Sequence, residues 1–151
     1  MKEYKSLTNK EQSERLISLG IKPETADFVL VKWECESYSI KMAGDESEDE
    51  EVIRRCWTFS RLLEMMPEEI YRGVTSHGGR LVAEELWYDR IICGTSVGYF
   101  SYTEKGKIVL INSQEKDIFT NLINIIEWLI KSEELNQEYL ITLPENPEQS
   151  L

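Results

Sequence analysis

Residues 97–131 read VGYFSYTEKGKIVLINSQEKDIFTNLINIIEWLIK, and this stretch contains signals for both kinds of secondary structure. β-Branched and aromatic residues at 97–102 and 107–111 flank a short Thr-Glu-Lys-Gly loop, a pattern typical of a β-hairpin. From about 114 to 131, apolar residues recur at helical spacing. We expect this long C-terminal amphipathic helix to lie across the sheet of the hairpin. The stretch therefore predicts an α+β fold, with helices packed on one face of a small antiparallel sheet.

One side chain of the predicted helix does not follow its apolar stripe. The stripe consists of Ile118, Phe119, Leu122, Ile125, Ile126 and Leu129. Trp128 projects roughly 140° from the centre of the stripe, on the side of Asp117, Asn121 and Asn124. Either residues 139–143 cover the Trp128 ring, or the ring is left for a partner. Trp128 is therefore a candidate interaction residue.

Upstream of the hairpin, the sequence carries signals for further helices and strands. A capping box that starts at Thr8 predicts a first helix, and Gly20 ends it. Pro23 can occupy the first position of a second helix, and Thr58 can cap a third. Residues 37–42 alternate strictly between apolar and polar side chains, which predicts a strand.

Three other segments give weaker signals. Ala26, Val29 or Leu30, and Trp33 recur at helical spacing, so we expect them on the core face of the second helix. Pro67 either ends the third helix or starts another short helix that closes at Gly73. Residues 81–88 fit neither period cleanly, and we favour a strand there.

The length of 151 residues fits one domain that buries its own core without disulfides or a metal. We expect a single α+β domain over residues 1–143, with an acidic loop at 44–52 and a flexible tail at 144–151. The first residues lack the apolar run of a signal peptide, and no stretch is apolar enough to span a membrane. We therefore expect a cytoplasmic protein that does not enter a membrane.

The chain has 28 acidic and 17 basic residues, for a net charge of −11. This balance disfavours direct binding to nucleic-acid phosphates or anionic lipid, which requires clustered Lys and Arg. Six carboxylates crowd one segment: Asp45, Glu46, Glu48, Asp49, Glu50 and Glu51. A block of like charges is usually a solvated loop, but these six are also candidate interaction residues.

Other roles for the acidic loop stay open at this point. It can mimic a nucleic-acid backbone and so inhibit a nucleic-acid-binding protein. It can also hold a divalent cation loosely, and a hydrolase that works through carboxylates and a metal ion is a further alternative. It is not an EF-hand, because Glu50 stands where that loop needs glycine and Cys56 where it needs glutamate.

No other motif predicts chemistry. Residues 94–98, Gly-Thr-Ser-Val-Gly, have the spelling of a nucleophile elbow, but strand-like residues follow them. The single histidine, His77, lies upstream where the hydrolase order needs it downstream. The three cysteines, Cys35, Cys56 and Cys93, are scattered, and we expect buried free thiols. We therefore expect no catalytic residue, no cofactor and no metal ligand.

Three segments carry a resemblance to a known group of proteins. They are residues 19–28 with Thr-Ala-Asp, residues 56–67 with Trp-Thr-Phe-Ser-Arg-Leu-Leu-Glu, and residues 124–130 with Glu-Trp-Leu-Ile. Here the chain resembles small uncharacterised proteins encoded by phages, prophages and related mobile elements of gut bacteria. The resemblance implies helices, a hairpin and an amphipathic helix in this order, and it implies no catalytic or binding residue. Together these features predict a non-enzymatic protein-interaction protein of phage or mobile-element origin, whose partner is an unidentified protein.

Overall fold

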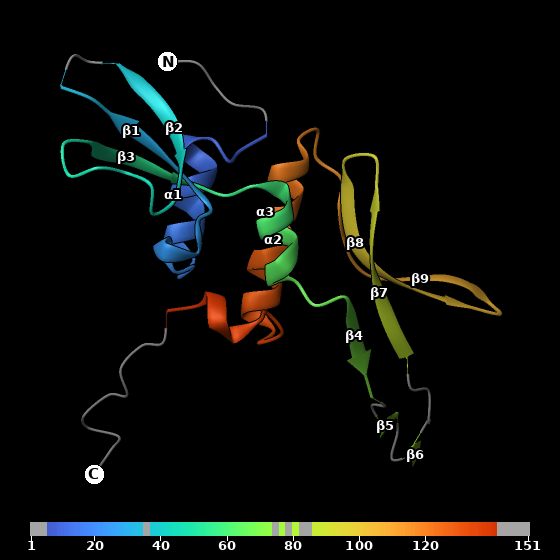
Figure 1. Ribbon diagram of the computed structural model, residues 1–151. Coiled ribbons are helices and arrows are strands. Elements are labelled where there is room, and N and C mark those ends of the chain that lie inside the picture. Colours follow the sequence, from blue (N-terminus) through green and yellow to red (C-terminus); the bar gives the residue numbers. More distant parts are fainter. Residues whose placement is uncertain (1–5, 35–36, 74–75, 78–79, 82–85, 142–151) are drawn as a thin grey trace, which may run out of the picture. The chain divides into compact units, whose positions relative to one another are not determined.

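The computed structural model describes residues 6–34, 37–73, 76–77, 80–81 and 86–141. The chain divides into two compact units. The split unit combines Met1–Thr58 with Asn136–Leu151, and the central unit is Phe59–Leu135. Both units contain helices and antiparallel strands, so the predicted α+β class is confirmed (Figure 1). The strands belong to separate sheets instead of one, and a single domain over residues 1–143 stays a prediction.

The split unit contains a three-stranded antiparallel sheet in the order β2-β1-β3. Its strands are β1 (Phe28–Lys32), β2 (Tyr38–Met42) and β3 (Glu51–Cys56). The strand predicted at 37–42 is thus confirmed. The side chains of Val29, Leu30 and Val31 are all buried, because β1 is the central strand and both of its faces are covered.

The second predicted helix is wrong, because its residues Phe28–Lys32 form β1. Only one 3₁₀ turn, η1 (Pro23–Thr25), follows Pro23. Val29 is buried as a strand residue, while Trp33 lies outside the core and is exposed. A continuous apolar run fits the core face of a helix and a doubly covered strand equally well. Pairing with β2 and β3 decides between them.

The N-cap of helix α1 (Lys10–Ser18) lies one residue later than predicted. Asn9 is the N-cap, and its side chain and that of Gln12 each accept a backbone N–H of the other at 2.9 Å. The Thr8 hydroxyl instead accepts from the backbone N–H of Trp57 at 3.0 Å. Gly20, with φ +96°, follows the helix as predicted, since this left-handed conformation favours glycine.

The last described residues return to the split unit. The backbone N–H of Lys22 donates to the carbonyl of Tyr139, and that of Ile141 donates to the carbonyl of Gly20, both at 2.8 Å. The second 3₁₀ turn, η2 (Gln137–Tyr139), lies in this returning segment. The expected tail at 144–151 lies outside the described residues.

The central unit contains a four-stranded antiparallel sheet in the order β4-β7-β8-β9. Its elements are α2 (Phe59–Met65), β4 (Glu69–Arg72), β7 (Leu86–Cys93), β8 (Ser96–Thr103), β9 (Gly106–Ser113) and α3 (Ile118–Lys131), with a small hairpin of β5 (Ser76–His77) and β6 (Arg80–Leu81). The β8–β9 hairpin and α3 confirm the hairpin and the helix predicted within residues 97–131, but α3 begins at Ile118 and not at about residue 114. Residues 86–88 are strand as favoured, whereas 82–85 lie outside the described residues. A strand, β4, replaces the alternative of a short helix after Pro67.

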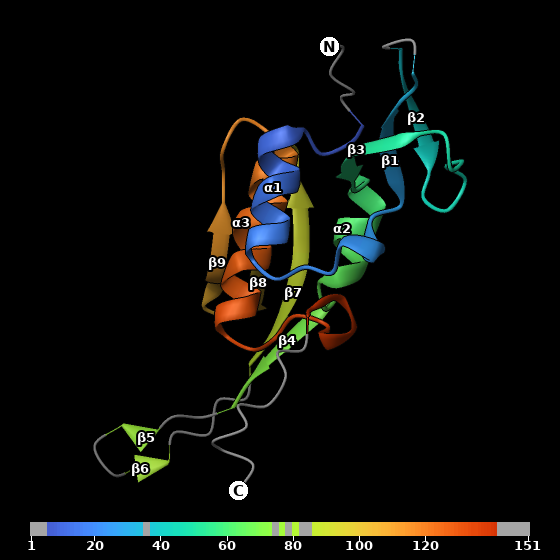
Figure 2. The same cartoon turned by 90° about the vertical axis from the view of Figure 1, so that its left-hand side faces the viewer.

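Helix α3 packs against β8 and β9, and α2 packs against α3 (Figures 1 and 2). The Asp117 side chain caps α3 by accepting the backbone N–H of Thr120 at 3.2 Å. The apolar stripe is buried apart from Ile118, which is half-buried. Asn121, predicted on the polar side, is also fully buried. Within the described ranges, no helix combines the length and the apolar character needed to span a membrane.

Two side chains of the sheet attach it to the last turn of α2 and to the residues that follow it. The Arg90 guanidinium donates from Nη1 to the carbonyls of Leu63 and Met66, each at 3.0 Å. The Tyr99 hydroxyl donates to the carbonyl of Pro67 at 2.6 Å. Burial raises the pKa of Tyr99, so this hydroxyl keeps its proton and remains a donor.

Candidate functional site

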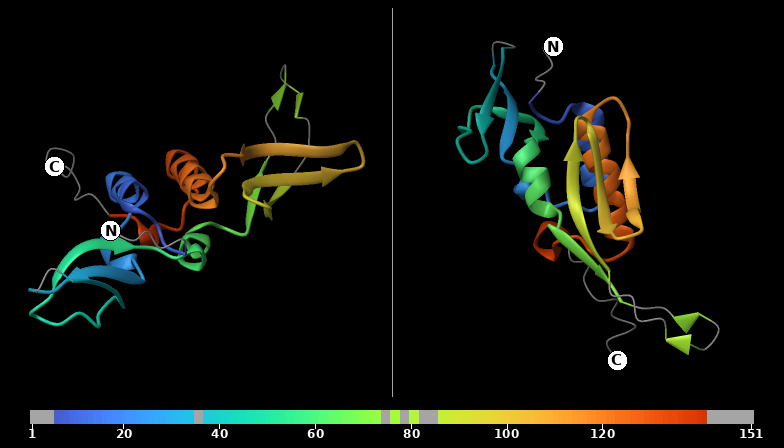
Figure 3. Two further views of the ribbon diagram at one scale, coloured as in Figure 1. Left: turned by 90° about the horizontal axis from the view of Figure 1, so that it is seen from above. Right: turned by 90° about the vertical axis from the view of Figure 1, so that its right-hand side faces the viewer.

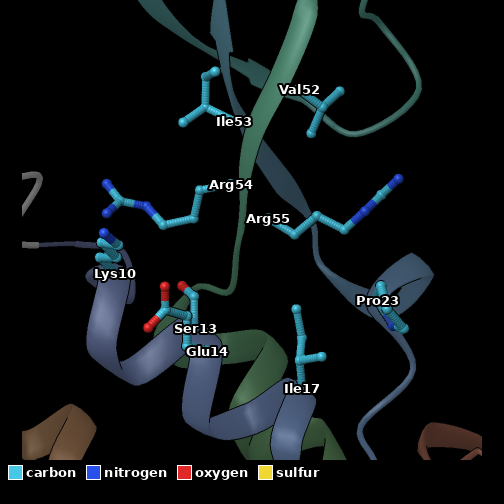
Figure 4. A pocket seen from close by; sticks show the side chains of 9 residues that line it. All are labelled: Lys10, Ser13, Glu14, Ile17, Pro23, Val52, Ile53, Arg54 and Arg55. Atoms are coloured by element: carbon cyan, nitrogen blue, oxygen red, sulfur yellow. The ribbon is translucent and has the colours of Figure 1, made fainter.

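A hollow of about 370 Å³ opens beside α1 and β3, entirely within the split unit (Figure 4). We call it the α1–β3 pocket. It is lined by Lys10, Ser13, Glu14 and Ile17 of α1, by Pro23, and by Val52, Ile53, Arg54 and Arg55 of β3.

A β-bulge explains why four consecutive residues of β3 line one pocket. In a regular strand, successive side chains point to opposite faces. Here Leu30 pairs with Arg54 and Val31 pairs with Val52, so Ile53 is an extra residue between the two pairs. A bulge bends its strand and redirects its side chains. The shift in register therefore turns this part of β3 toward α1.

The pocket carries more positive than negative charge. Its cations are Lys10, Arg54 and Arg55, and its one carboxylate is Glu14. In Figure 4 the Arg54 side chain extends toward Lys10, so two cations lie on the same side of the pocket. The Nε atom of Arg54 is buried and has no hydrogen-bond partner among the described residues. This local charge contrasts with the net charge of −11 of the whole chain.

The second surface feature is the face of the four-stranded sheet that α2 and α3 leave uncovered. Side chains of directly paired residues share a face, and Ile70, Tyr88 and Tyr99 lie on the buried one. Figure 3 shows both helices of the central unit, α2 and α3, on one side of its sheet. The opposite face carries Tyr71, Trp87, Phe100, Tyr102 and Val109, and we call it the open sheet face.

Aromatic side chains dominate the open sheet face. Tyr71 and Trp87 are paired, with ring centroids 5.1 Å apart. Trp87 is 55% exposed and Tyr102 is 66% exposed. Phe100 is the exception, because the Lys107 ammonium lies 4.4 Å from its ring centroid and its ring is buried. Large exposed apolar groups on one face are typical of an interaction surface.

Trp128, the candidate in α3, is half-buried. The Arg72 guanidinium lies 5.7 Å from the centroid of its ring, and Arg72 also forms an ion pair with Glu134. The ring therefore has a cationic neighbour within the central unit. Residues 142–143 lie outside the described residues, so cover of Trp128 by 139–143 stays a prediction.

The six candidate carboxylates divide into two groups. Four of them are exposed: Asp45, Glu48, Asp49 and Glu51. Glu46 and Glu50 are instead held by their own neighbours. The Glu46 carboxylate accepts the backbone N–H of Gly44 at 2.7 Å, and backbone hydrogen bonds lower its pKa. Some carboxylates of the loop between β2 and β3 therefore form hydrogen bonds within the loop instead of pointing freely into solvent.

Glu50 is the most strongly held of the six. Its side chain is buried, accepts the backbone N–H and the hydroxyl of Ser47 at 3.1 and 3.0 Å, and forms an ion pair with Lys41. Burial alone would raise the pKa of Glu50, but these bonds outweigh it and the pKa lies below its usual value.

The remaining motifs give no catalytic arrangement. Gly94, with φ +62°, forms the turn between β7 and β8, and Ser96 pairs with Cys93 at the start of β8. A hairpin thus stands where an elbow would need a helix. His77 lies in β5. In the described ranges, no three His, Cys, Asp or Glu side chains are grouped to hold a metal ion.

The cysteine prediction holds for one of the two described thiols. Cys56 is buried, and burial raises the pKa of its thiol. Cys93 is exposed, contrary to expectation, because it ends β7 at the hairpin turn. Cys35 lies outside the described residues.

No protein-family model, curated protein or solved structure matches this chain. The functional argument therefore rests on the geometry of the α1–β3 pocket and of the open sheet face. Sequence reasoning missed both of them. The exposed Tyr71 and Trp87 lie in segments without a clear strand period, and the pocket depends on a bulge that only pairing with β1 produces.

Proposed function

We propose that this chain is a non-enzymatic protein-interaction protein that binds a partner protein on its open sheet face. The observation that carries the proposal is the exposure of Tyr71, Trp87 and Tyr102 on a sheet whose other face is already packed against helices. These aromatics are not needed to complete the core of the central unit. Tyr and Trp are also the residues most enriched at the energetic centres of protein interfaces.

The origin of the chain and the nature of its partner form part of this proposal. The resemblance of residues 19–28, 56–67 and 124–130 to proteins of phages and mobile elements supports a cytoplasmic role in such an element. The partner is then a protein of the host or of the phage.

The alternative, an acidic mimic of nucleic acid, has weaker support. A mimic needs its carboxylates directed to solvent, where they can occupy a basic cleft on another protein. Glu50 is buried against Lys41 and Ser47, and Glu46 is bonded to Gly44. Only part of the acidic loop is therefore free for this role.

A capture experiment with matched variants tests the proposal. Proteins bound by the full chain from a bacterial lysate are compared with those bound by Trp87→Ser and by Tyr38→Ser. Tyr38 is an exposed aromatic of the split unit, so it controls for the loss of an exposed ring. We expect Trp87→Ser to reduce capture of the partner at least tenfold and Tyr38→Ser to preserve it. Equal capture by wild type and Trp87→Ser would contradict the proposal.

The same capture experiment, repeated at different salt concentrations, distinguishes the proposed interaction from the acidic mimic. Binding through a mimic should weaken steeply as salt screens the carboxylates. Binding through an apolar aromatic face should persist at 0.5 M salt. Loss of capture at that salt concentration, without sensitivity to Trp87→Ser, would favour the mimic.

A further inference from the structure

Part of the lining of the α1–β3 pocket is apolar surface that is exposed to solvent. Ile17, Val52 and Ile53 are 42%, 37% and 40% exposed, and all three line the pocket together with Pro23. Withdrawing such surface from water stabilises a complex by about 25 cal/mol per Å². The volume of the pocket, about 370 Å³, lies near the lower end of the roughly 300–1,000 Å³ typical of small-molecule sites.

The polar part of the same pocket is suited to an anion. Lys10, Arg54 and Arg55 form no ion pair within the part of the chain that the structure describes. The buried Nε of Arg54 lacks an acceptor among the same residues, and an unpaired buried donor costs free energy. A guanidinium group binds carboxylate or phosphate oxygens through parallel hydrogen bonds. An anion beside the Arg54 guanidinium would therefore supply a missing countercharge.

Glu14 does not cancel this preference. It is exposed, and it is the only carboxylate among the nine lining residues, against three cations. Outside the lining, Glu46 interacts electrostatically with Arg55, so the preference for an anion rests on Lys10 and Arg54. Lys10 and Arg54 are therefore the two cations that favour an anionic ligand.

We infer that the α1–β3 pocket binds a small amphiphile with one anionic head group and a short apolar chain. The head group lies beside Arg54 and Lys10, and the chain lies against Ile17, Val52 and Ile53. This site belongs to the split unit and is independent of the protein interaction proposed for the central unit.

Octanoate, kept below its critical micelle concentration, is the probe. It is titrated into the full chain, which is labelled at the methyl groups of Ile and Val, and binding is followed by NMR. We expect shifts of the Ile17, Val52 and Ile53 signals, while Ile118 in the central unit stays unchanged. Octanol and octyltrimethylammonium carry the same chain without the negative charge, and acetate carries the charge without the chain. We expect all three to bind at least tenfold more weakly than octanoate.

Two variants locate the head group. Arg54→Gln should weaken octanoate binding about tenfold and leave octanol binding unchanged. Lys105→Gln, which removes one exposed cation from the central unit, should change neither. If Arg54→Gln does not fold, the comparison of head groups on the wild-type protein still decides the question.

Three outcomes would overturn the inference. The first is equal affinity for octanoate and octyltrimethylammonium. The second is a set of shifts spread over both units. The third is the absence of any shift at millimolar octanoate. This outcome would also overturn the inference if an acidic peptide, tested separately, shifted the signals of the same methyl groups.

Discussion

The two faces of the four-stranded sheet in the central unit both carry aromatic residues, but those of one face are buried and most of those of the other are exposed. The covered face places Tyr88, Val97 and Tyr99 beneath helices, where each is at most 7% exposed. The open sheet face places Tyr71, Trp87 and Tyr102 in solvent. Because neighbouring residues of a strand point to opposite faces, the same strands supply both sets.

The covered face contributes to the stability of the fold, whereas the open sheet face is available for binding. On the covered face, apolar packing is combined with directed polar bonds, such as the one from Tyr99 to Pro67. On the open sheet face, exposed rings contribute little to folding and much to any complex that covers them. Substitutions on the covered face should therefore lower the free energy of unfolding, and those on the open sheet face should change it little.

The largest effect is expected for Tyr99→Ala. Tyr99 is fully buried, and truncation of a buried aromatic leaves a cavity that costs about 3–5 kcal/mol. Urea unfolding followed by circular dichroism measures the loss. Tyr99→Phe, which keeps the ring and removes only the bond to Pro67, should lose about 1 kcal/mol. A loss below 1 kcal/mol for Tyr99→Ala would break the distinction between the faces.

The second effect concerns Asn121, the buried polar residue of α3. Its Oδ1 accepts from the Ser113 hydroxyl at 2.8 Å and from the Glu115 N–H at 2.6 Å, and its Nδ2 donates to the carbonyls of Thr95 and Glu115. Asn121→Ala leaves several of these groups without partners, so we expect a loss of about 3 kcal/mol in free energy of unfolding.

Asn124→Ala is the matched control for Asn121. Asn124 is half-buried and donates to the Ser113 hydroxyl at 3.0 Å. The same unfolding measurement should give a loss below about 1 kcal/mol. Equal losses for the two variants would show that the buried hydrogen bonds of Asn121 contribute no more to the free energy of unfolding than the single bond of Asn124.

The third effect tests a position on the open sheet face that behaves unlike its neighbours. A Cβ atom at Gly98 would lie 2.6 Å from the carbonyl oxygen of Ile111 and 2.8 Å from the ring of Phe100. Gly98→Ala should therefore cost about 2 kcal/mol through overpacking, although a methyl group is small. Thermal unfolding measures the change, and Ser96→Ala in the same strand serves as the control. An unchanged midpoint would mean that the Phe100 ring moves freely.

The smallest effect on stability is expected for Trp87→Ser. Trp87 is more than half exposed, so the change should alter the free energy of unfolding by about 0.5 kcal/mol. Urea unfolding of the purified variant gives this value. A loss above 2 kcal/mol would assign Trp87 to the core and remove the open sheet face as an interaction surface.

Local sequence signals predicted the elements whose structure is decided locally. The β8–β9 hairpin carries its own turn residue, Gly106, with φ +116°, and α3 carries its own cap and stripe. The strand β1 was missed because its apolar run also fits a helix, and only pairing with β2 and β3 decides. Asn121 was misplaced because its partners at Thr95 and Glu115 lie outside the helix.

The candidate sites were harder to predict than the fold, for a similar reason. The acidic loop and Trp128 stand out in the sequence by charge and by size. The α1–β3 pocket depends on the extra residue Ile53 in β3, and the open sheet face depends on the pairing of Tyr71 with Trp87. Both arise from contacts between segments that are distant along the chain.

The return of residues 139–141 to Gly20 and Lys22 has a consequence for synthesis of the protein on the ribosome. The chain grows at about 5–20 residues per second, and domains fold as their residues become available. All residues of the central unit, Phe59–Leu135, are made before Tyr139 and Ile141, which bond to the first segment of the split unit. The segment made first is thus the one whose last backbone partners are made after every residue of the central unit.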